Sequence, residues 1–170
     1  GVEVKRPEIG VLIEVPAAVY QARLLAKEAD FMAVGSNDLT QYLLAVDRNN
    51  PRVADLYQEV HPAVISALRE VARAAHAEEK PLGICGELAG TPAGAILLMA
   101  MGYHVLSMNA THLLRVKWVI RNIKRSDARR MLARVLRMDT AEEVTAFLHK
   151  DLVRLGLSKV MPARSTTQLH

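Results

Sequence analysis

Polar or reactive side chains follow four short apolar runs in this 170-residue chain. In chain order they are Glu14, the pair Asn37 and Asp38, the pair Cys85 and Glu87, and Asn109. Ligands of parallel α/β folds bind outside the carboxyl ends of the strands, so residues at these positions are candidates for one shared site. A carboxylate placed directly after a buried run is costly unless a cation or hydrogen bonds compensate it.

Glu14 and Asp38 form an oxygen-ligand pair of the kind that Mg²⁺ prefers. This ion usually takes one or two carboxylates and shares its other positions with water and substrate phosphate. Each candidate also has a purely structural interpretation. Glu14 is equally suited to an arginine pair, Asn37 and Asp38 to helix capping, and Cys85 to burial as an inert thiol. Arg48 would ordinarily be an exposed charge at a helix end. Only the joint placement of these residues distinguishes a site from the alternatives.

Strands and helices alternate along the chain. Strands are expected at 9–15, 31–34, 82–85 and 104–108, with helical spacing at 17–29, 39–46, 53–60 and 62–79 between them. The alternation predicts parallel strands joined by right-handed crossovers, which is an α/β fold. A complete (β/α)₈ barrel needs eight strands and about 200–250 residues, so the chain is either a small doubly wound open sheet or half a barrel. Composition alone favours the open sheet.

Capping signals delimit the remaining helices. Helices are expected at 93–101, 111–124, 126–137 and from 141 to about 156. The signals are Thr91 with Pro92, Gly102 as a C′ residue, Thr111, Ser126, and a capping box of Thr140 with Glu143.

The composition indicates one soluble globular domain, with 51% hydrophobic and 24% charged residues. The longest apolar stretch, 93–101, is far shorter than the roughly 18–20 residues of a membrane helix, so no span is predicted. The single cysteine fits a reducing compartment, and we expect a cytoplasmic protein.

Residues 113–137 carry nine basic residues against one acid. Such a segment is a candidate for binding nucleic acid or an acidic protein face. Apolar residues recur between the charges at helical spacing, beginning at Leu113 and Leu114, which favours the solvated side of an amphipathic helix instead. No aromatic interleaving or recognition motif supports nucleic acid.

Three motifs carry a family resemblance: GVLIEVP at 10–16, GSNDLTQYLLAVDRNN at 35–50 and GICGELAG at 83–90. Together they resemble the C-terminal, phosphoenolpyruvate (PEP)-binding domain of Enzyme I of the bacterial phosphotransferase system, and more distantly pyruvate phosphate dikinase and PEP synthase. The ending DRNN at 47–50 and LSMN at 106–109 are most similar to the nitrogen-regulatory Enzyme I paralogue. The resemblance extends in order to about Gly156.

The resemblance implies the second half of a PEP-utilising (β/α)₈ barrel, strands five to eight, with C-terminal helices over 1–156 and a flexible tail at 157–170. It outweighs the preference for an open sheet. By matching positions, Glu14 and Asp38 correspond to the Mg²⁺ ligands, and Asn37 with the Asp38 backbone to the phosphate contacts. Arg48 corresponds to the arginine that holds the anionic groups of the substrate. Cys85 corresponds to the acid that protonates the enolate carbon, with Glu87 in support.

The implied activity is transfer of the PEP phosphoryl group to a histidine on a separate N-terminal domain. Pyruvate is released, and the phosphoryl group passes on to a phosphocarrier protein. None of the six histidines lies in the family's phosphohistidine motif, and the family's other substrate arginines belong to the first half of the barrel. We therefore expect a fragment of a longer polypeptide, inactive alone.

Two further expectations follow from the resemblance. The family dimerises through this domain, so a homodimer is expected, and the alternative function is a dimerisation or interaction module. Thr91 stands where the family usually has Asp, which predicts altered hydrogen bonding nearby without loss of the fold.

Overall fold

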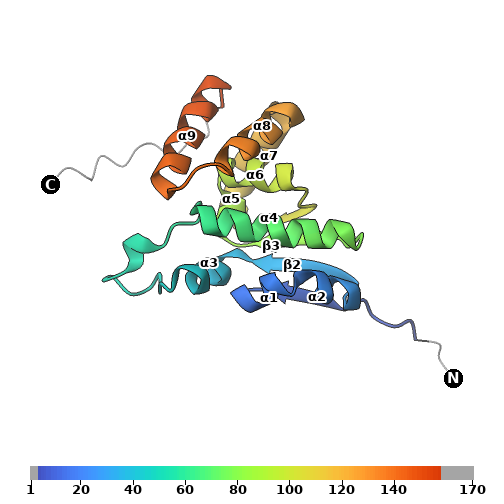
Figure 1. Ribbon diagram of the computed structural model, residues 1–170. Helices are drawn as coiled ribbons and strands as arrows, with labels where there is room; N and C mark the ends of the chain where they lie inside the picture. The colour runs from blue at the N-terminus through green and yellow to red at the C-terminus, as the bar shows by residue number, and fades with distance from the viewer. Residues whose placement is uncertain (1–3, 158–170) are drawn as a thin grey trace.

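Four parallel strands form the sheet of this protein, whose computed structural model describes residues 4–157 (Figure 1). They are β1 (Gly10–Ile13), β2 (Phe31–Gly35), β3 (Leu82–Cys85) and β4 (Val105–Ser107). The spatial order is β1-β2-β3-β4, the same as the chain order. Gly35 of β2 pairs with Cys85 of β3, which pairs in turn with Ser107 of β4. The predicted parallel α/β architecture is confirmed, and the carboxyl ends of the strands meet at one rim.

Helices connect each strand to the next. Between β1 and β2 lie α1 (Pro16–Tyr20) and α2 (Ala22–Glu28). Between β2 and β3 lie α3 (Ser36–Leu44), a 3₁₀ turn η1 (Ala54–Leu56) and α4 (Pro62–Ala77). The short α5 (Glu87–Gly90) and α6 (Pro92–Met101) lead to β4, and α7 (Ala110–Asn122), α8 (Arg125–Val135) and α9 (Ala141–Arg154) follow it.

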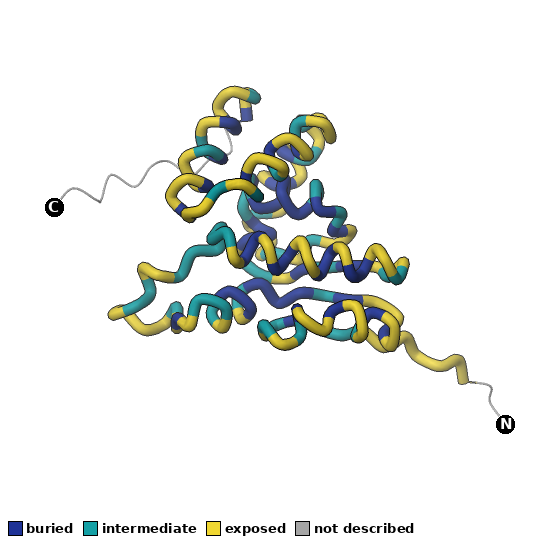
Figure 2. The backbone as a smooth tube through the Cα atoms, viewed as in Figure 1, coloured by how far each residue is buried: buried dark blue, intermediate teal, exposed yellow. Residues whose placement is uncertain are grey.

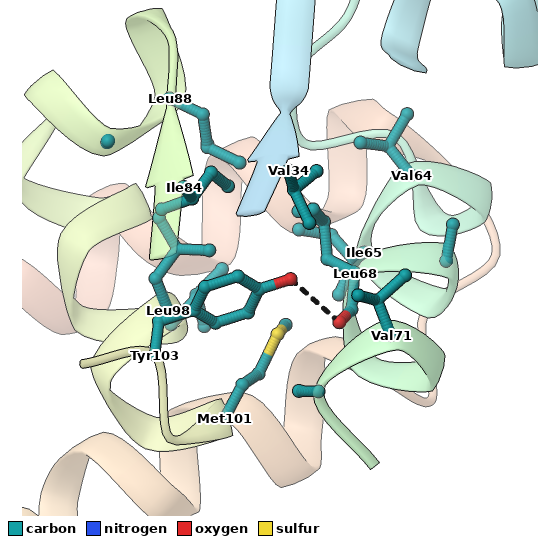
Figure 3. Packing of buried hydrophobic residues seen from close by; sticks show 14 of the residues in the cluster. Val34, Val64, Ile65, Leu68, Val71, Ile84, Leu88, Leu98, Met101 and Tyr103 are labelled. Atoms are coloured by element: carbon teal, nitrogen blue, oxygen red, sulfur yellow. Dashed lines mark hydrogen bonds between the residues drawn. The ribbon is translucent and has the colours of Figure 1, made fainter. Parts of the chain in front are cut away.

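The hydrophobic core lies between one face of the sheet and the helices (Figures 2 and 3). Alternate strand residues enter it, among them Val34 and Ile84, and they meet the apolar stripe of α4, including Leu68. Tyr103 is buried with them, and its hydroxyl donates a hydrogen bond of 3.0 Å to the Leu68 carbonyl oxygen (Figure 3). The buried Tyr103 hydroxyl therefore has a hydrogen-bond partner inside the core.

The other face of the sheet is uncovered by the described residues. Leu12, Phe31 and Val105 point from the strands with 48%, 39% and 61% of their surface exposed. A doubly wound sheet has helices on both faces, so the open sheet favoured by composition is not observed. Composition does not encode which face is covered. Four parallel strands in chain order with helices on one face are the arrangement of half a (β/α)₈ barrel, in which the bare face corresponds to the barrel interior.

The expected helix at 17–29 is two helices that break at Gln21, and the helical spacing at 53–60 yields only the single turn η1. Caps at Thr111 and Ser126 are wrong, because α7 begins after Asn109 and α8 after Lys124. The Asn109 Oδ1 accepts hydrogen bonds from both the amide and the hydroxyl of Thr111, so the asparagine caps the helix.

Thr91, Gly102 and Thr140 cap their helices as predicted, but the second bond of the capping box differs, because the Glu143 carboxylate accepts from the Asp139 amide at 3.1 Å and not from the Thr140 amide. Thr91 Oγ1 accepts from the Gly94 amide, so replacing the family's Asp with Thr leaves α6 capped. Gly102 ends α6 with a φ of +94°, and Thr140 Oγ1 accepts from the Glu143 amide at the start of α9. The expected tail began at Leu157, but this residue is buried in the core. Residues 158–170 of that tail lie outside the described residues.

The basic segment forms α7 and α8. The amphipathic interpretation is confirmed for Val116 and Val119, which are buried while the arginines face outward. It is wrong for Leu113 and Leu114, which are 52% and 78% exposed, because no described element covers that side of α7. Among the helices at 4–157, none has the length and apolar character needed to cross a membrane.

Candidate functional site

The carboxyl rim of the sheet collects the residues singled out from the sequence. Glu14 follows β1, and its side chain lies across the neighbouring strand end at Gly35. A Cβ at position 35 would collide with the Glu14 carboxylate, so the absence of a side chain there is what admits this approach. Glu14 therefore faces the end of β2, from which α3 and Asp38 begin.

Asn37 and Asp38 occupy the first turn of α3, yet neither caps it, since no side-chain capping bond is present at its N-terminus. The Asn37 Oδ1 instead accepts a 3.0 Å hydrogen bond from the Glu87 amide at the start of α5. The Asp38 Oδ1 accepts from Gln41 Nε2 at 3.2 Å. The capping interpretation is thus wrong, and Asn37 ties the end of β2 to the segment after β3.

Gln41 is a site residue that the sequence reasoning missed. While its amide nitrogen binds Asp38, its Oε1 accepts a 3.1 Å hydrogen bond from the Arg48 backbone amide. One side chain therefore fixes both the carboxylate on α3 and the loop that carries the arginine. The available signal was the spacing, because Asp and Gln three residues apart share a helix face.

Arg48 lies in the loop after α3 and reaches across to α5. Its Nη1 is 3.0 Å from Glu87 Oε1, and the two side chains are 35% and 63% exposed. Arg48 is thus held by the chain and is not the free helix-end charge of the structural interpretation. Sequence reasoning expected Glu87 to support Cys85, whereas the carboxylate of Glu87 pairs with Arg48.

Cys85 ends β3 with an exposed thiol, so its interpretation as an inert buried residue is wrong. Its Sγ donates a weak hydrogen bond of 3.6 Å to the Val34 carbonyl oxygen. The thiol opens into a hollow of about 330 Å³, which Asn37, Glu87 and Asn109 also line. Three of the four strand ends thus contribute to one concavity.

The rim fits a Mg²⁺ ion that is shared with a substrate. Within residues 4–157, the Glu14 carboxylate takes part in no hydrogen bond or ion pair, and Asp38 engages the chain through Oδ1 to Gln41. Over the same residues, no three His, Cys, Asp or Glu side chains form a complete metal cage. Two oxygen ligands with open positions are what Mg²⁺ uses when phosphate and water complete its shell.

A second cavity of about 720 Å³ adjoins Glu87 on the side of α9. Its lining includes Tyr57 and Glu59 from the loop before α4, and Thr91 and Glu142. Burial raises the pKa of Glu59 to about 7, with a further increase from Glu87 and an opposing effect from Arg48. Burial, and then the charge of Glu59, raises the pKa of Tyr57 to about 12. No motif in the sequence marks these two residues.

Comparison with known proteins agrees with the motifs. Residues 2–125 match the family described as PEP-utilising enzyme, PEP-binding domain. The "Phosphoenolpyruvate-dependent phosphotransferase system" protein of Escherichia coli (strain K12) is 43% identical over 165 residues, 92% of this chain and 22% of the relative. A "Phosphoenolpyruvate-protein phosphotransferase" of Haemophilus influenzae is 42% identical over 151 residues, 89% of this chain and 26% of the relative.

A "Multiphosphoryl transfer protein" of Xanthomonas campestris pv. campestris is 43% identical over 146 residues, 85% of this chain and 17% of the relative. The chain therefore spans about a quarter or less of the length of these relatives.

Proposed function

This chain belongs to the PEP-utilising enzymes, of which it carries the PEP-binding domain, and we propose that it is the C-terminal part of a PEP-protein phosphotransferase. The complete protein transfers the phosphoryl group of PEP to a histidine on a separate N-terminal domain and releases pyruvate. The phosphohistidine then supplies a phosphocarrier protein. Identities of 42–43% to proteins with these names support the assignment.

The observation that carries the proposal is the convergence of polar side chains from successive strand ends. Glu14 lies over the end of β2, Asn37 is bonded to the Glu87 amide, and Glu87 is paired with Arg48. Carboxylates, an amide and an arginine from successive strand ends thus lie along one rim. These are the groups that recognise a phosphorylated carboxylic acid.

Phosphoryl transfer depends mainly on positioning and charge neutralisation. In the proposed complex Glu14 and Asp38 hold Mg²⁺, which supplies positive charge to the phosphate oxygens. Asn37 donates its side-chain amide to the phosphate, and the Asp38 backbone amide contributes a second donor. Arg48, whose orientation Glu87 and Gln41 fix, binds the anionic groups of PEP through its guanidinium fork.

Cys85 is proposed as the proton donor of the second half-reaction. Loss of the phosphoryl group leaves pyruvate enolate, which must gain a proton at carbon. The S–H proton moves to that carbon, the electron pair of the enolate forms the new C–H bond, and the sulfur is left as a thiolate that water reprotonates. An exposed thiol at the rim is suited to this step, whereas a buried one is not.

The rest of the proposed enzyme lies in segments that this chain does not contain. We infer that residues 1–156 form strands five to eight of the barrel, and that the bare face holding Leu12, Phe31 and Val105 is covered by the first half. We further propose a cytoplasmic homodimer related to the nitrogen-regulatory Enzyme I paralogue. The single cysteine supports the cytoplasmic compartment, and the motifs at 47–50 and 106–109 support the relation to that paralogue.

A second candidate function is an interaction module. The same exposed apolar face favours it, because uncovered sheet residues and strand edges invite pairing with another chain. Sedimentation of the chain distinguishes the two cases. Self-association that disappears when the preceding segment of the polypeptide is restored indicates simple barrel completion, and association that persists indicates a dimer interface.

Binding of PEP to the intact protein, measured by calorimetry with and without Mg²⁺, tests the proposed function. We expect Mg²⁺-dependent binding that is lost in Glu14→Ala and in Arg48→Ala. Matched controls are Glu28→Ala and Arg73→Ala, which remove exposed charges of the same kind from α2 and from α4. Unchanged binding in the first two variants would show that the site is assigned incorrectly.

A further inference from the structure

The loop between α3 and α4 carries Arg48 in its first part and leads back towards the start of α4 in its second part (Figure 1). It leaves α3 at Ala45, passes through η1 and brings Tyr57 and Glu59 to the cavity behind Glu87. Arg48 and Glu59 therefore approach Glu87 from two parts of one loop. The cavity is closed on the far side by α9, which contributes Glu142.

Two polar atoms in this region are buried without a hydrogen-bond partner in the described part of the chain, the Tyr57 hydroxyl and the Glu59 Oε1. Native proteins satisfy nearly all buried polar groups, and exceptions concentrate where the group has a task other than stability. The partly buried Glu59 side chain keeps this unsatisfied oxygen beside the Arg48–Glu87 ion pair.

The titratable groups around Glu59 lie on several different elements. Glu87 lies on α5 and Arg48 on the same loop, while Tyr57 stands two residues away. Glu142 of α9 lines the cavity but is engaged by Gln58 Nε2 at 3.2 Å. His61 at the start of α4 uses Nδ1 to accept from the Ala63 amide. Within residues 4–157, Arg48 is the cation whose charge acts on Glu59, and Glu87 is the other carboxylate that attracts Arg48.

We propose that Glu59 is a positioning residue for the PEP site, whose charge competes with Glu87 for Arg48 and so sets how strongly the guanidinium holds the anionic substrate. This inference rests on the proposed function and adds a regulated step to it. With Glu59 neutral, Arg48 is balanced by Glu87 alone and presents its remaining donors to PEP. With Glu59 ionised, a second carboxylate attracts the same guanidinium and adds negative potential beside the bound anion.

The direction of the effect follows from the pKa of Glu59. Because burial raises this pKa to about 7, the side chain is mostly neutral at pH 6 and mostly ionised at pH 8.5. The ionisation of Glu59 is therefore expected to weaken PEP binding across this interval, in addition to any change that the titration of PEP itself causes. The weakening due to Glu59 should be about threefold, the size expected when one charge acts on a partly exposed ion pair.

The test compares KM for PEP between wild type and Glu59→Gln in the intact protein from pH 6 to 8.5. Taking the ratio at each pH cancels the titration of PEP. The ratio of wild-type KM to variant KM should be near one at pH 6 and rise to about three at pH 8.5. Glu59→Asp, which keeps a carboxylate, should retain a rising ratio against Glu59→Gln. Glu142→Gln, which removes a carboxylate engaged by Gln58 in the same cavity, should follow wild type.

A ratio that stays flat in an active wild-type enzyme overturns the positioning role and leaves the proposed function intact. Intact wild type that forms no phosphoprotein from PEP overturns both. Equal lowering of kcat at every pH in Glu59→Gln, with KM unchanged, also contradicts the inference, because a merely structural defect carries no pH dependence.

Discussion

Two tyrosine hydroxyls show how the core of this protein differs from its rim. Tyr103, between the sheet and α4, donates its hydroxyl proton to the Leu68 carbonyl oxygen at 3.0 Å. The hydroxyl of Tyr57, beside the Arg48–Glu87 pair, is equally inaccessible but has no partner among residues 4–157. The core thus satisfies the tyrosine hydroxyl that it buries, whereas the tyrosine hydroxyl at the rim is left unpaired.

The difference shows what each region is built for. In the core, apolar burial and a completed hydrogen bond contribute to the free energy of folding. At the rim, the Glu59 Oε1, like the Tyr57 hydroxyl, is buried without a hydrogen-bond partner among residues 4–157. Polar groups left in this state cost stability and are kept where binding or chemistry needs them. Substitutions in the two regions should therefore differ in both size and sign.

The largest difference is expected between two leucines. Leu68→Ala empties a fully buried position on α4 and should lower the free energy of unfolding by about 2–5 kcal/mol. Leu56→Ala, in the loop that carries Arg48, removes a side chain that is 63% exposed and should change it by less than about 0.5 kcal/mol. Denaturant unfolding of the chain measures both. Equal losses would mean that the loop is packed as tightly as the core.

The second prediction concerns the sign of the rim's contribution. Glu59 has a folded-state pKa of about 7, above its ordinary value of 4.5, because burial makes ionisation of its carboxyl group unfavourable in the folded protein. The stability associated with its neutral form is complete below pH 4.5 and is lost as pH rises through 7. Glu59→Gln should therefore match wild type at pH 4.5 and be more stable at pH 8.5, by on the order of 2 kcal/mol.

Thermal unfolding at the two pH values checks this prediction. Glu142→Gln provides the control, because burial does not raise the pKa of that exposed side chain above its ordinary value; its hydrogen bonds lower it. A Glu59→Gln variant that is less stable than wild type at pH 8.5 would show that the ionised carboxylate has a stabilising partner.

The core was more predictable from sequence than the rim. Strands at 82–85 and caps at Thr91 and Gly102 follow from local rules, because turn chemistry and apolar spacing act within a few residues. Asn109 was identified as a polar strand end, and its capping of α7 was missed because Thr111 offered a competing signal. Which face of the sheet is left without helices depends on how distant segments pack against it, and no local sequence pattern carries that information.

The site divides in the same way. Glu14, Asn37, Asp38, Arg48 and Cys85 could be identified because motifs mark them and strand ends gather at one rim. The two hydrogen bonds of Gln41 and the Arg48–Glu87 ion pair could not be identified, because both depend on the path of the loop after α3. Glu59 had no signal at all, because its altered pKa arises from burial by segments distant in sequence.

The third prediction concerns the close approach at the rim. Gly35 has an ordinary φ of −88°, so alanine is compatible with the backbone, and the three atoms nearest to the added methyl group all belong to the Glu14 side chain. Gly35→Ala should displace Glu14 and raise the Mg²⁺ concentration required for PEP binding by about tenfold, a loss typical of disturbing a metal site. Gly83→Ala is the control, because its Cβ would meet Val105 at an ordinary 3.5 Å. Mg²⁺ titrations of the intact protein distinguish the two.

The smallest expected effects return to the two tyrosines and test the comparison directly. Tyr103→Phe removes a made hydrogen bond from the core and should lower the free energy of unfolding by about 1 kcal/mol. Tyr57→Phe removes a buried hydroxyl that has no partner in the described residues, so it should be neutral or slightly stabilising. The two substitutions delete the same atom, which makes each the control for the other in parallel denaturant titrations. A loss of about 1 kcal/mol in both would mean that the Tyr57 hydroxyl is satisfied after all, and the core and the rim would then follow one rule.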